Sequence, residues 1–427
     1  MKKIFALGIL LLLLMSRGYA QDENVLKSEE DTGAVVFTSS DKTLNQTYLW
    51  ARKQALAYAF EGDPVGLWYE AALPGREAFC MRDVSHQSFG AHVLGLDAYN
   101  NNMFFQFAAH ISNSQDWCSY WEINRYGEPA PVDYYSDDAF WYNLPANFDL
   151  MDAMYRMFTW TGDQSYFNDP VLLNFYKRSV HDYVHRWDLE LDQIMKRKRI
   201  MNQSGGIKET NRFQYARGIP GYDESDPNYV LGLDQLAVQY AGYKAYGKLM
   251  AMKGDESESE TFLKKARQVR NFINTKWWDD QNKHYYSVLD TSYTMKHTGN
   301  LSRSVLYFHV AEGEGQIKSV LNEIKSYIAQ ASLDRVEILS HLPEILFNYE
   351  QNESAFKLLN RLPESRRRAY PEVSYSIMGS LVKGLMGIKV TLQAPIEAIQ
   401  QGGYNYQVIS TKPRIYGSTG WAEIKHG

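Results

Sequence analysis

The sequence predicts an all-α fold, an (α/α)6 toroid in which six α-hairpins form an inner and an outer ring of helices. Two observations predict it. The apolar residues follow a helical period almost everywhere after residue 40. The predicted helices also arrive in successive pairs, without strand runs between them. Short β-rich segments are expected only at the two ends of the chain.

About twelve helices are expected, the number that six hairpins require. They cover Thr43–Phe60, Val84–Tyr99, Asn101–Ser112, Ala139–Thr161, Pro170–Arg186, Tyr229–Lys253, Ser257–Lys276, Leu301–Ala311, Gly315–Ala329, Val336–Tyr349, Asn352–Arg361 and Val373–Ile388. The helix from Tyr229 is apolar on nearly all sides, which predicts an inner position. The charged helix from Ser257 suits the outer ring.

The first residues have the pattern of a secretory signal peptide. Lys2 and Lys3 precede the apolar run Ile4–Met15, and small residues surround Ala20. The run is shorter than the roughly 20 residues of a membrane span. We therefore expect cleavage near Ala20, a periplasmic or secreted protein, and no membrane span in the mature chain.

The rest of the chain is divided by its hydrophobic pattern. Residues 21–41 are expected to form an N-terminal extension, and residues 42–390 the barrel. Residues 391–427 alternate between apolar and polar, as in "YNYQVIST" and "GWAEIKHG", and predict a β-rich C-terminal extension. So little remains to form a sheet that this segment is either a truncated β-domain or a small extension of the barrel.

The charge argues against a nucleic-acid partner. The formal net charge is −5, and removal of residues 1–20, with two Lys, one Arg and no acid, changes it to −8. A nucleic-acid-binding surface would favour a basic balance. The 31 Tyr and 10 Trp suit a helical core, and they also suit the apolar faces of sugars. The oligomeric state is left open.

No metal or other cofactor is predicted. His86 and His92 are six residues apart, not at the i, i+4 spacing that shares a helix face, and neither they nor His110 belong to an HExxH motif. The two cysteines, Cys80 and Cys118, are too few for a disulfide framework, and whether they pair stays open.

Carboxylates and aromatic residues gather in the segments between the predicted helices, which indicates sugar chemistry. Glycosidic bond cleavage needs one carboxylic acid for the leaving oxygen and one carboxylate for water or covalent attack. Asp223 is the candidate acid and Glu372 the candidate base, from distant parts of the chain. Their alternatives are Glu224 or Asp226 as the acid, and Glu337 or Glu344 as the base. A solvated turn at Asp223 and a favourable helix-start charge at Glu372 are the competing structural explanations.

Three motifs resemble those of the six-hairpin glycoside hydrolases, which include trehalases, processing α-glucosidases, glucoamylases and exo-α-mannosidases. They are "CMRDVSHQ" from Cys80, "GYDES" from Gly221 and "YPEVSY" from Tyr370. The resemblance implies that Arg82 and Asp83 bind hydroxyls of the terminal sugar. It also implies that Asp223 is the general acid and Glu372 the general base of an inverting reaction.

Three further residues are expected to touch the sugar: Trp141 and Tyr142 by stacking, and His86 through a hydroxyl group. The sequence therefore predicts a secreted glycoside hydrolase that cleaves a terminal sugar from an oligosaccharide or glycan. The alternatives are a polysaccharide lyase or unsaturated-uronyl hydrolase on the same toroid, and a catalytically silent carbohydrate-binding barrel.

Overall fold

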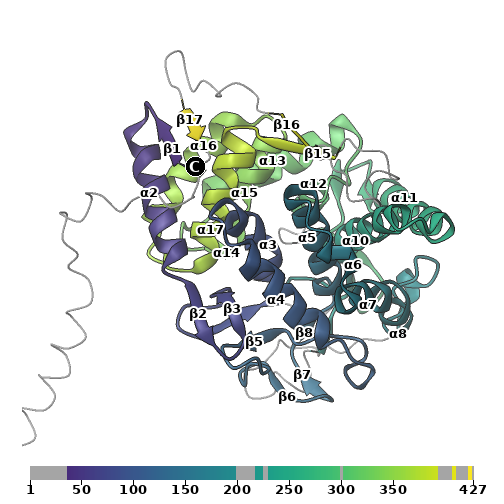
Figure 1. Ribbon diagram of the computed structural model, residues 1–427. Helices are drawn as coiled ribbons and strands as arrows, with labels where there is room; N and C mark the ends of the chain where they lie inside the picture. Colours follow the sequence, from purple (N-terminus) through teal and green to yellow (C-terminus); the bar gives the residue numbers. More distant parts are fainter. Residues whose placement is uncertain are drawn as a thin grey trace, which may run out of the picture.

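The computed structural model describes residues 36–198, 217–224, 229–298, 302–392, 406–409 and 422–425. The predicted signal peptide, most of the predicted N-terminal extension and Asp226 lie outside these residues. The described chain is mostly helical, with short strands between the helices (Figure 1).

The helices follow one another along the whole described chain. They are α2 Lys42–Leu56, α3 Met81–Val93, α4 Asp97–Ala109, α5 Ala146–Thr161, α6 Ser165–Asn168, α7 Pro170–Arg178, α8 Val184–Arg186, α10 Leu233–Met252, α11 Glu256–Lys276, α12 Arg303–Tyr307, α13 Glu314–Gln330, α14 Val336–Leu339, α15 Leu342–Asn348, α16 Asn352–Arg361 and α17 Pro371–Gly379. Two π-helical turns, η2 Ser179–Tyr183 and η6 Ser380–Leu385, continue α7 and α17. Short 3-10 turns lie at η1 Asn113–Gln115, η3 Ile194–Lys196 and η5 Leu362–Glu364.

The strands are short and form small sheets of two or three strands. They are β1 Val36–Ser39, β2 Ala59–Asp63, β3 Gly66–Tyr69, β4 Ala78–Cys80, β5 Glu122–Asn124, β6 Tyr134–Ser136, β7 Ala139–Phe140, β8 Tyr142–Asn143, β9 Arg217–Ile219, β10 Tyr229–Gly232, β11 Trp278–Asp279, β12 His284–Tyr285, β13 Val288–Asp290, β14 Met295–Lys296, β15 Lys389–Leu392, β16 Tyr406–Ile409 and β17 Ala422–Lys425. The pair β8–β9 is parallel, and the other paired strands are antiparallel.

The expectation that strands occur only at the ends of the chain was wrong. Strands also occur between the helices, and two predicted helices begin later because of them, whereas a third has shifted bounds for another reason. The helix expected from Ala139 begins at Ala146, directly after Pro145, because residues 139–143 belong to β7 and β8. The helix expected from Tyr229 begins at Leu233, because β10 pairs with β13. The helix expected from Val84 to Tyr99 starts at Met81 and stops at Val93, where Gly95 takes a left-handed φ of 77°.

The strands expected at the two ends are present. β1 and β17 pair antiparallel, with Val36 opposite Lys425 and Ser39 opposite Ala422. Figure 1 shows β17 beside β1 and α2. The pair therefore joins the segments predicted as the N-terminal and C-terminal extensions.

Two sets of helices can be distinguished by their packing. In the first set, α3 packs against α5 and α17, and α10 packs against α5 and α12. In the second set, each helix covers a member of the first: α2 covers α17, α4 covers α3, α11 covers α10, and α13 covers α12. The crossing of α3 and α17 is close, because a Cβ on Gly90 would lie 2.0 Å from the Tyr375 carbonyl oxygen.

The sequence patterns of α10 and α11 explain their different positions. In α10 every residue is buried except Lys244, Lys248 and Ala251. In α11 only a stripe at helical spacing is buried, which includes Phe262, Val269 and Ile273. The expectation of a buried helix followed by a covering amphipathic helix is confirmed.

The first helix set, with α14, carries a charged residue within its opening turns. These residues are Asp83 on α3, Asp149 on α5, Asp234 on α10, Arg303 on α12, Glu337 on α14 and Glu372 on α17. A negative side chain there is favoured by the helix dipole. The packing of the helices brings several of these charges close together.

Two further expectations concern the chain as a whole. Within the described ranges, no helix has both the length and the hydropathy of a membrane span. Cys80 and Cys118 are both buried and form no disulfide with each other.

Candidate active site

A cavity of about 420 Å³ opens beside the first turns of α3, α14 and α17. It is lined by Ala72, Leu73, Arg76, Cys80, Arg82, Asp83, Trp121, Glu122, Tyr222, Glu224, Arg335, Glu337, Ile338, Arg367 and Tyr370. The lining combines four arginines and four acidic residues with three aromatic rings, a composition suited to a polar ligand with apolar faces.

Arg82 and Asp83 reach this cavity because β4 ends at Cys80, opposite Glu122 of β5, and α3 starts at the next residue. Arg82 Nε lies 3.2 Å from Asp83 Oδ1, and the Tyr370 hydroxyl donates to Asp83 Oδ2 at 2.8 Å. Burial raises the pKa of Asp83 to about 6, although Arg82 opposes the shift. The guanidinium group of Arg82 also lies 5.2 Å from the ring centre of Tyr222. The structure thus places the predicted Arg-Asp pair in the cavity wall.

Glu372 lies beside this pair, in the first turn of α17 after Pro371. It is 1% exposed, and its Oε1 is paired with Nε2 of His341. Burial by itself would raise the pKa of Glu372, but His341, with Arg82 and His86, holds it below the ordinary value. The second oxygen, Oε2, is buried and has no hydrogen-bond partner. The site therefore contains a charged carboxylate with one oxygen available.

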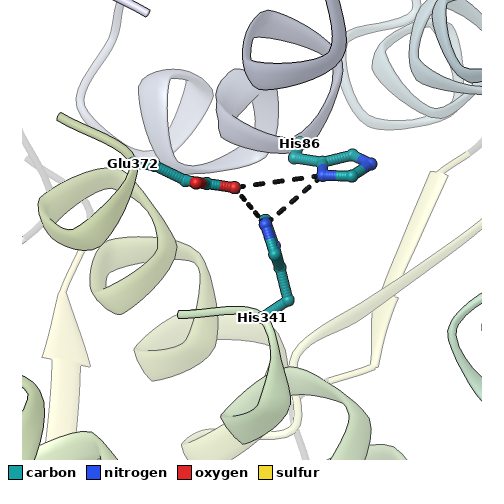
Figure 2. Close-up of side chains that lie close together, drawn as sticks. All are labelled: His86, His341 and Glu372. Carbon is teal, nitrogen blue, oxygen red and sulfur yellow. Dashed lines mark hydrogen bonds and ion pairs between the residues drawn. The ribbon is translucent and has the colours of Figure 1, made fainter. Parts of the chain in front are cut away.

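Two histidines converge on Glu372, as Figure 2 shows. His86 comes from α3, and His341 precedes α15. His86 Nδ1 lies 3.3 Å from His341 Nε2 and 4.0 Å from Glu372 Oε1. Burial and the neighbouring His341 lower the pKa of His86 well below its ordinary value.

The same three residues form a group that could hold a metal ion, since one ligand atom from each lies within 4.8 Å of the others. No local sequence pattern indicates this group, because His341 and Glu372 are far from His86 along the chain. The other histidines considered there lie elsewhere: His92 pairs with Asp97 at 2.7 Å, and His110 bonds to the Gln106 carbonyl at 2.6 Å.

Tyr222, which also lines the cavity, connects its loop to two helices by hydrogen bonds. Its hydroxyl donates to Asp149 Oδ2, and its backbone N–H donates to Asp234 Oδ2 at 2.6 Å. Burial raises the pKa of Asp149 and of Asp234 to about 7 in each case. His86 Nε2 lies 3.4 Å from Asp149 Oδ1. This contact connects the carboxylate of α5 with the histidine group.

The structure distinguishes between the candidate general acids Asp223 and Glu224. Glu224 lines the cavity, whereas Asp223 does not, and the Asp223 carbonyl oxygen accepts a bond from the Tyr229 hydroxyl. Burial by itself would lower the pKa of the Arg82 guanidinium group. The nearby Asp83, and after it Glu224, raise this pKa above its ordinary value. Of the two candidate acids, only Glu224 lines the cavity.

The candidate bases are separated as well. Glu337 lines the cavity and pairs with Arg367 at 2.5 Å. Glu344 lines a different cavity and pairs with Lys383. Glu372 is not among the residues that line the cavity. It lies close enough to Arg82 and Asp83, which do line it, for their charges to interact, and His86 Nδ1 is 4.0 Å from its Oε1.

Trp141 and Tyr142 are not brought to the cavity. They are 3% and 0% exposed and belong to the hydrophobic core. Trp141 Nε1 donates to Asn143 Oδ1 at 2.9 Å, and the Tyr142 hydroxyl donates to Asn147 Oδ1 at 2.5 Å. The aromatic lining comes instead from Trp121, Tyr222 and Tyr370.

Glu122 is a site residue that the sequence analysis missed. It is 2% exposed and accepts a bond from Arg76 Nη1 at 2.7 Å. Burial and the neighbouring Asp133 raise its pKa to about 9, against the opposing effect of Arg76. Only the pairing of β4 with β5 places it here, and neither strand was predicted.

No protein-family model and no curated protein sequence matches the chain. Solved structures do resemble it. The GH78 family rhamnosidase of Bacillus sp. GL1 gives a TM-score of 0.50 at 14% identity, over 84% of this chain and 36% of that one. A glycosidase in complex with glucose gives 0.51 at 10% identity, over 79% and 96% of the two chains. The rhamnosidase from Klebsiella oxytoca with rhamnose bound gives 0.51 at 11% identity, over 83% and 66%.

These similarities concern the fold, because the identities are low. The chain spans about a third of the first rhamnosidase and nearly the whole of the glycosidase. The fold is thus a helical one that occurs in glycosidases. What the protein does with it depends on the site.

Proposed function

We propose that the protein is a glycoside hydrolase that releases a terminal sugar with inversion at the anomeric carbon. The observation that carries the proposal is Glu372, a buried carboxylate bound by His341 through one oxygen and unpartnered at the other. It adjoins Arg82 and Asp83, and these two residues line a cavity large enough for a sugar. The resemblance to glycosidase folds supports the same conclusion.

Glu372 is the general base in this proposal. Its Oε2 accepts a hydrogen bond from a water and takes the proton as that water attacks the sugar. The contact with His341 fixes the carboxylate and keeps Oε1 occupied, so a single oxygen remains for the water.

Glu224 is the general acid, in place of its neighbour Asp223. It lines the cavity from the loop that follows β9. An inverting enzyme needs the two carboxyl groups roughly 6.5–9.5 Å apart, so that water fits between the base and the sugar.

The sugar itself is held by the wall of the cavity. Arg82 donates hydrogen bonds to its hydroxyl groups, and Asp83 accepts them, which gives orientation as well as affinity. Trp121 and Tyr222 provide ring surface beside Arg82 for an apolar sugar face.

The architecture and location belong to the same proposal. The packing of α3, α5, α10, α12 and α17, with their covering helices, supports a six-hairpin (α/α)6 toroid. Residues 42–390 would form the barrel, with β-rich extensions on either side. We also propose export through the signal peptide, with cleavage near Ala20 and a periplasmic or secreted product.

The test compares four forms of the protein: wild type, Glu372→Gln, Glu224→Gln and Asp223→Asn. Each is given α-L-rhamnosides and α- and β-glucosides, and the anomer released is followed by NMR. The proposal expects inverted product from wild type, loss in Glu372→Gln and Glu224→Gln, and activity in Asp223→Asn. Aryl glycosides with good leaving groups should restore Glu224→Gln but not Glu372→Gln, because such groups need no acid.

Other outcomes would overturn it. Unsaturated uronate products from acidic glycans would make the protein a lyase. Sugar binding without release, unchanged in Glu372→Gln, would make it a silent binding barrel.

A further inference from the structure

We propose that His86, His341 and Glu372 bind a zinc-like transition-metal dication, and that the bound ion blocks the base. The binding part stands on the geometry of this group. Only the inhibition rests on the proposed function.

The donor set suits such an ion. Two imidazole nitrogens and one carboxylate oxygen form a common set of protein ligands for zinc, which leaves one position for water. Their side chains come from α3, from the residue before α15 and from the first turn of α17. Two of the ligands stand on helices, and the third directly precedes one, which limits their movement.

The distances agree with a shared ion. Two nitrogens at about 2.0–2.1 Å from zinc, at a tetrahedral angle, lie about 3.3 Å apart. His86 Nδ1 and His341 Nε2 are 3.3 Å apart. His86 Nδ1 and Glu372 Oε1 are 4.0 Å apart, so a small movement brings both onto one ion.

Glu372 must turn away from His341 when the ion enters, since these two groups are in direct contact. The carboxylate has an oxygen to spare for this, because Oε2 is buried without a partner. Binding therefore breaks one contact and gives a ligand role to an unpartnered oxygen.

A carboxylate also lies next to the ring nitrogen of His86 that does not face the ion. His86 offers Nδ1 to the ion while its other nitrogen, Nε2, lies 3.4 Å from Asp149 Oδ1. Metal-binding histidines usually have such an outer partner, which fixes the ring and strengthens the ligand. Asp149 would be a positioning residue here.

Space and charge permit the ion. A small cavity of about 50 Å³ is lined by His341, Tyr222, Asp234 and Arg303, among others, and is large enough for a water beside His341. Arg82, Arg156 and Arg303 oppose a cation, whereas Glu372 attracts it. Asp83, Asp149 and Asp234 add attraction in their ionised forms.

The consequence for the enzyme is competition at one carboxylate. A metal bound to Glu372 prevents it from taking a proton from water. Micromolar zinc should then inhibit the hydrolase, and a chelator should restore it.

The experiment measures zinc binding directly, on the full chain stripped with a chelator, by equilibrium dialysis against ZnCl2. We expect one zinc per chain, and at least a tenfold weaker Kd in His86→Gln and in His341→Gln. His92→Gln is the matched control, because His92 lies on the same helix and pairs with Asp97. Its Kd should equal that of wild type.

A second measurement avoids dependence on how the variants fold. Co2+ added to the wild-type protein should give the strong visible absorption of a four-coordinate site, and ZnCl2 should abolish it. No stoichiometric zinc and a Co2+ spectrum like that of the aqueous ion would overturn the proposal.

The two proposals fail separately. Zinc bound by the triad in a protein that releases no sugar would leave the metal site standing and refute the hydrolase. Hydrolysis that is insensitive to zinc, with no bound metal, would refute the site and leave the hydrolase.

Discussion

Two cavities of similar size differ in the direction in which the pKa values of their buried acidic residues are shifted. The cavity at the first turns of α3, α14 and α17 measures about 420 Å³, and the one lined by the later turns of α5, α10 and α15 about 480 Å³. In the second, Glu344 pairs with Lys383 and Asp152 pairs with Arg156 at 2.8 Å. Burial by itself would raise the pKa of Glu344, but Lys383, with Arg156 and His341, lowers it to about 2.

In the first cavity, burial dominates instead. It raises the pKa of Asp83 to about 6 and, with Asp133, that of Glu122 to about 9. Glu372, which adjoins Arg82 and Asp83 but does not line the cavity, keeps an oxygen without a partner. Groups whose protonation is perturbed are typical of functional sites. Acids in both cavities have basic partners, since Asp83 pairs with Arg82, Glu122 with Arg76 and Glu337 with Arg367 in the first. The comparison teaches that the protonation of the acids, and not cavity volume or ion pairing, separates the two.

The largest expected effect tests the functional difference. Glu372→Gln should lower kcat about 10³-fold, within the range that a general base contributes. Glu344→Gln, in the other cavity, should keep kcat within about twofold of wild type. Steady-state kinetics on the best glycoside checks both. Equal losses in the two variants would remove the distinction between the cavities.

The second prediction concerns Glu122 and pH. Its folded-state pKa is raised from 4.5 to about 9, so the unfolded chain loses this proton first as the pH rises. The stability that the protonated group contributes is complete below pH 4.5 and is lost as the pH rises toward 9. Relative to Glu122→Gln, wild type should lose about 1 kcal/mol per pH unit between pH 5 and 8. Urea unfolding at each pH measures this, and parallel curves would contradict it.

Glu344 should behave with the opposite sign. Its folded-state pKa is depressed to about 2, so its contribution to stability is present above pH 4.5 and is lost as the pH falls through 2. Glu344→Gln should cost about 2 kcal/mol at pH 7, and less at pH 3. Urea unfolding at these two values checks it. A cost that does not depend on pH would mean that packing, and not charge, explains the loss.

The smallest effect concerns the aromatic walls. Trp121→Ala should raise KM about tenfold, since one stacked ring contributes roughly 1 kcal/mol or more. Trp160→Ala, in the second cavity, should leave KM unchanged. Similar KM values for all three proteins would show that Trp121 does not touch the sugar. Circular dichroism of both variants serves as the control for folding.

Much of the fold could be predicted because helical periodicity is a local property. The α16 bounds, Asn352–Arg361, agree with the sequence at both ends, and the buried pattern of α10 indicated its position. The short strands were not predicted, because a segment of two or three residues, such as Ala139–Phe140, is too short to show the alternating pattern of a strand. Their neighbours in space decide whether they pair.

The candidate site was predicted in part for the same reason. Arg82, Asp83 and Glu372 stand at helix starts, where a charge beside an apolar run is visible in the sequence. The neighbourhood of His341 and Glu372 depends on the packing of helices and has no local signal. Trp141 and Tyr142 look like a sugar-stacking pair, yet the strands before α5 direct them into the core. The preference for Glu224 over Asp223 also required the path of the loop.

Because β1 pairs with β17, β1 can complete its sheet only after the end of the chain has been made. Residues 36–39 leave the ribosome early, and their partners at 422–425 are made nearly four hundred residues later. Until then β1 presents unpaired N–H and C=O groups, which invite contacts with other chains. Contacts between such distant segments also slow folding, because a long loop must close first. This delay leaves one strand without its partner until synthesis has reached residues 422–425.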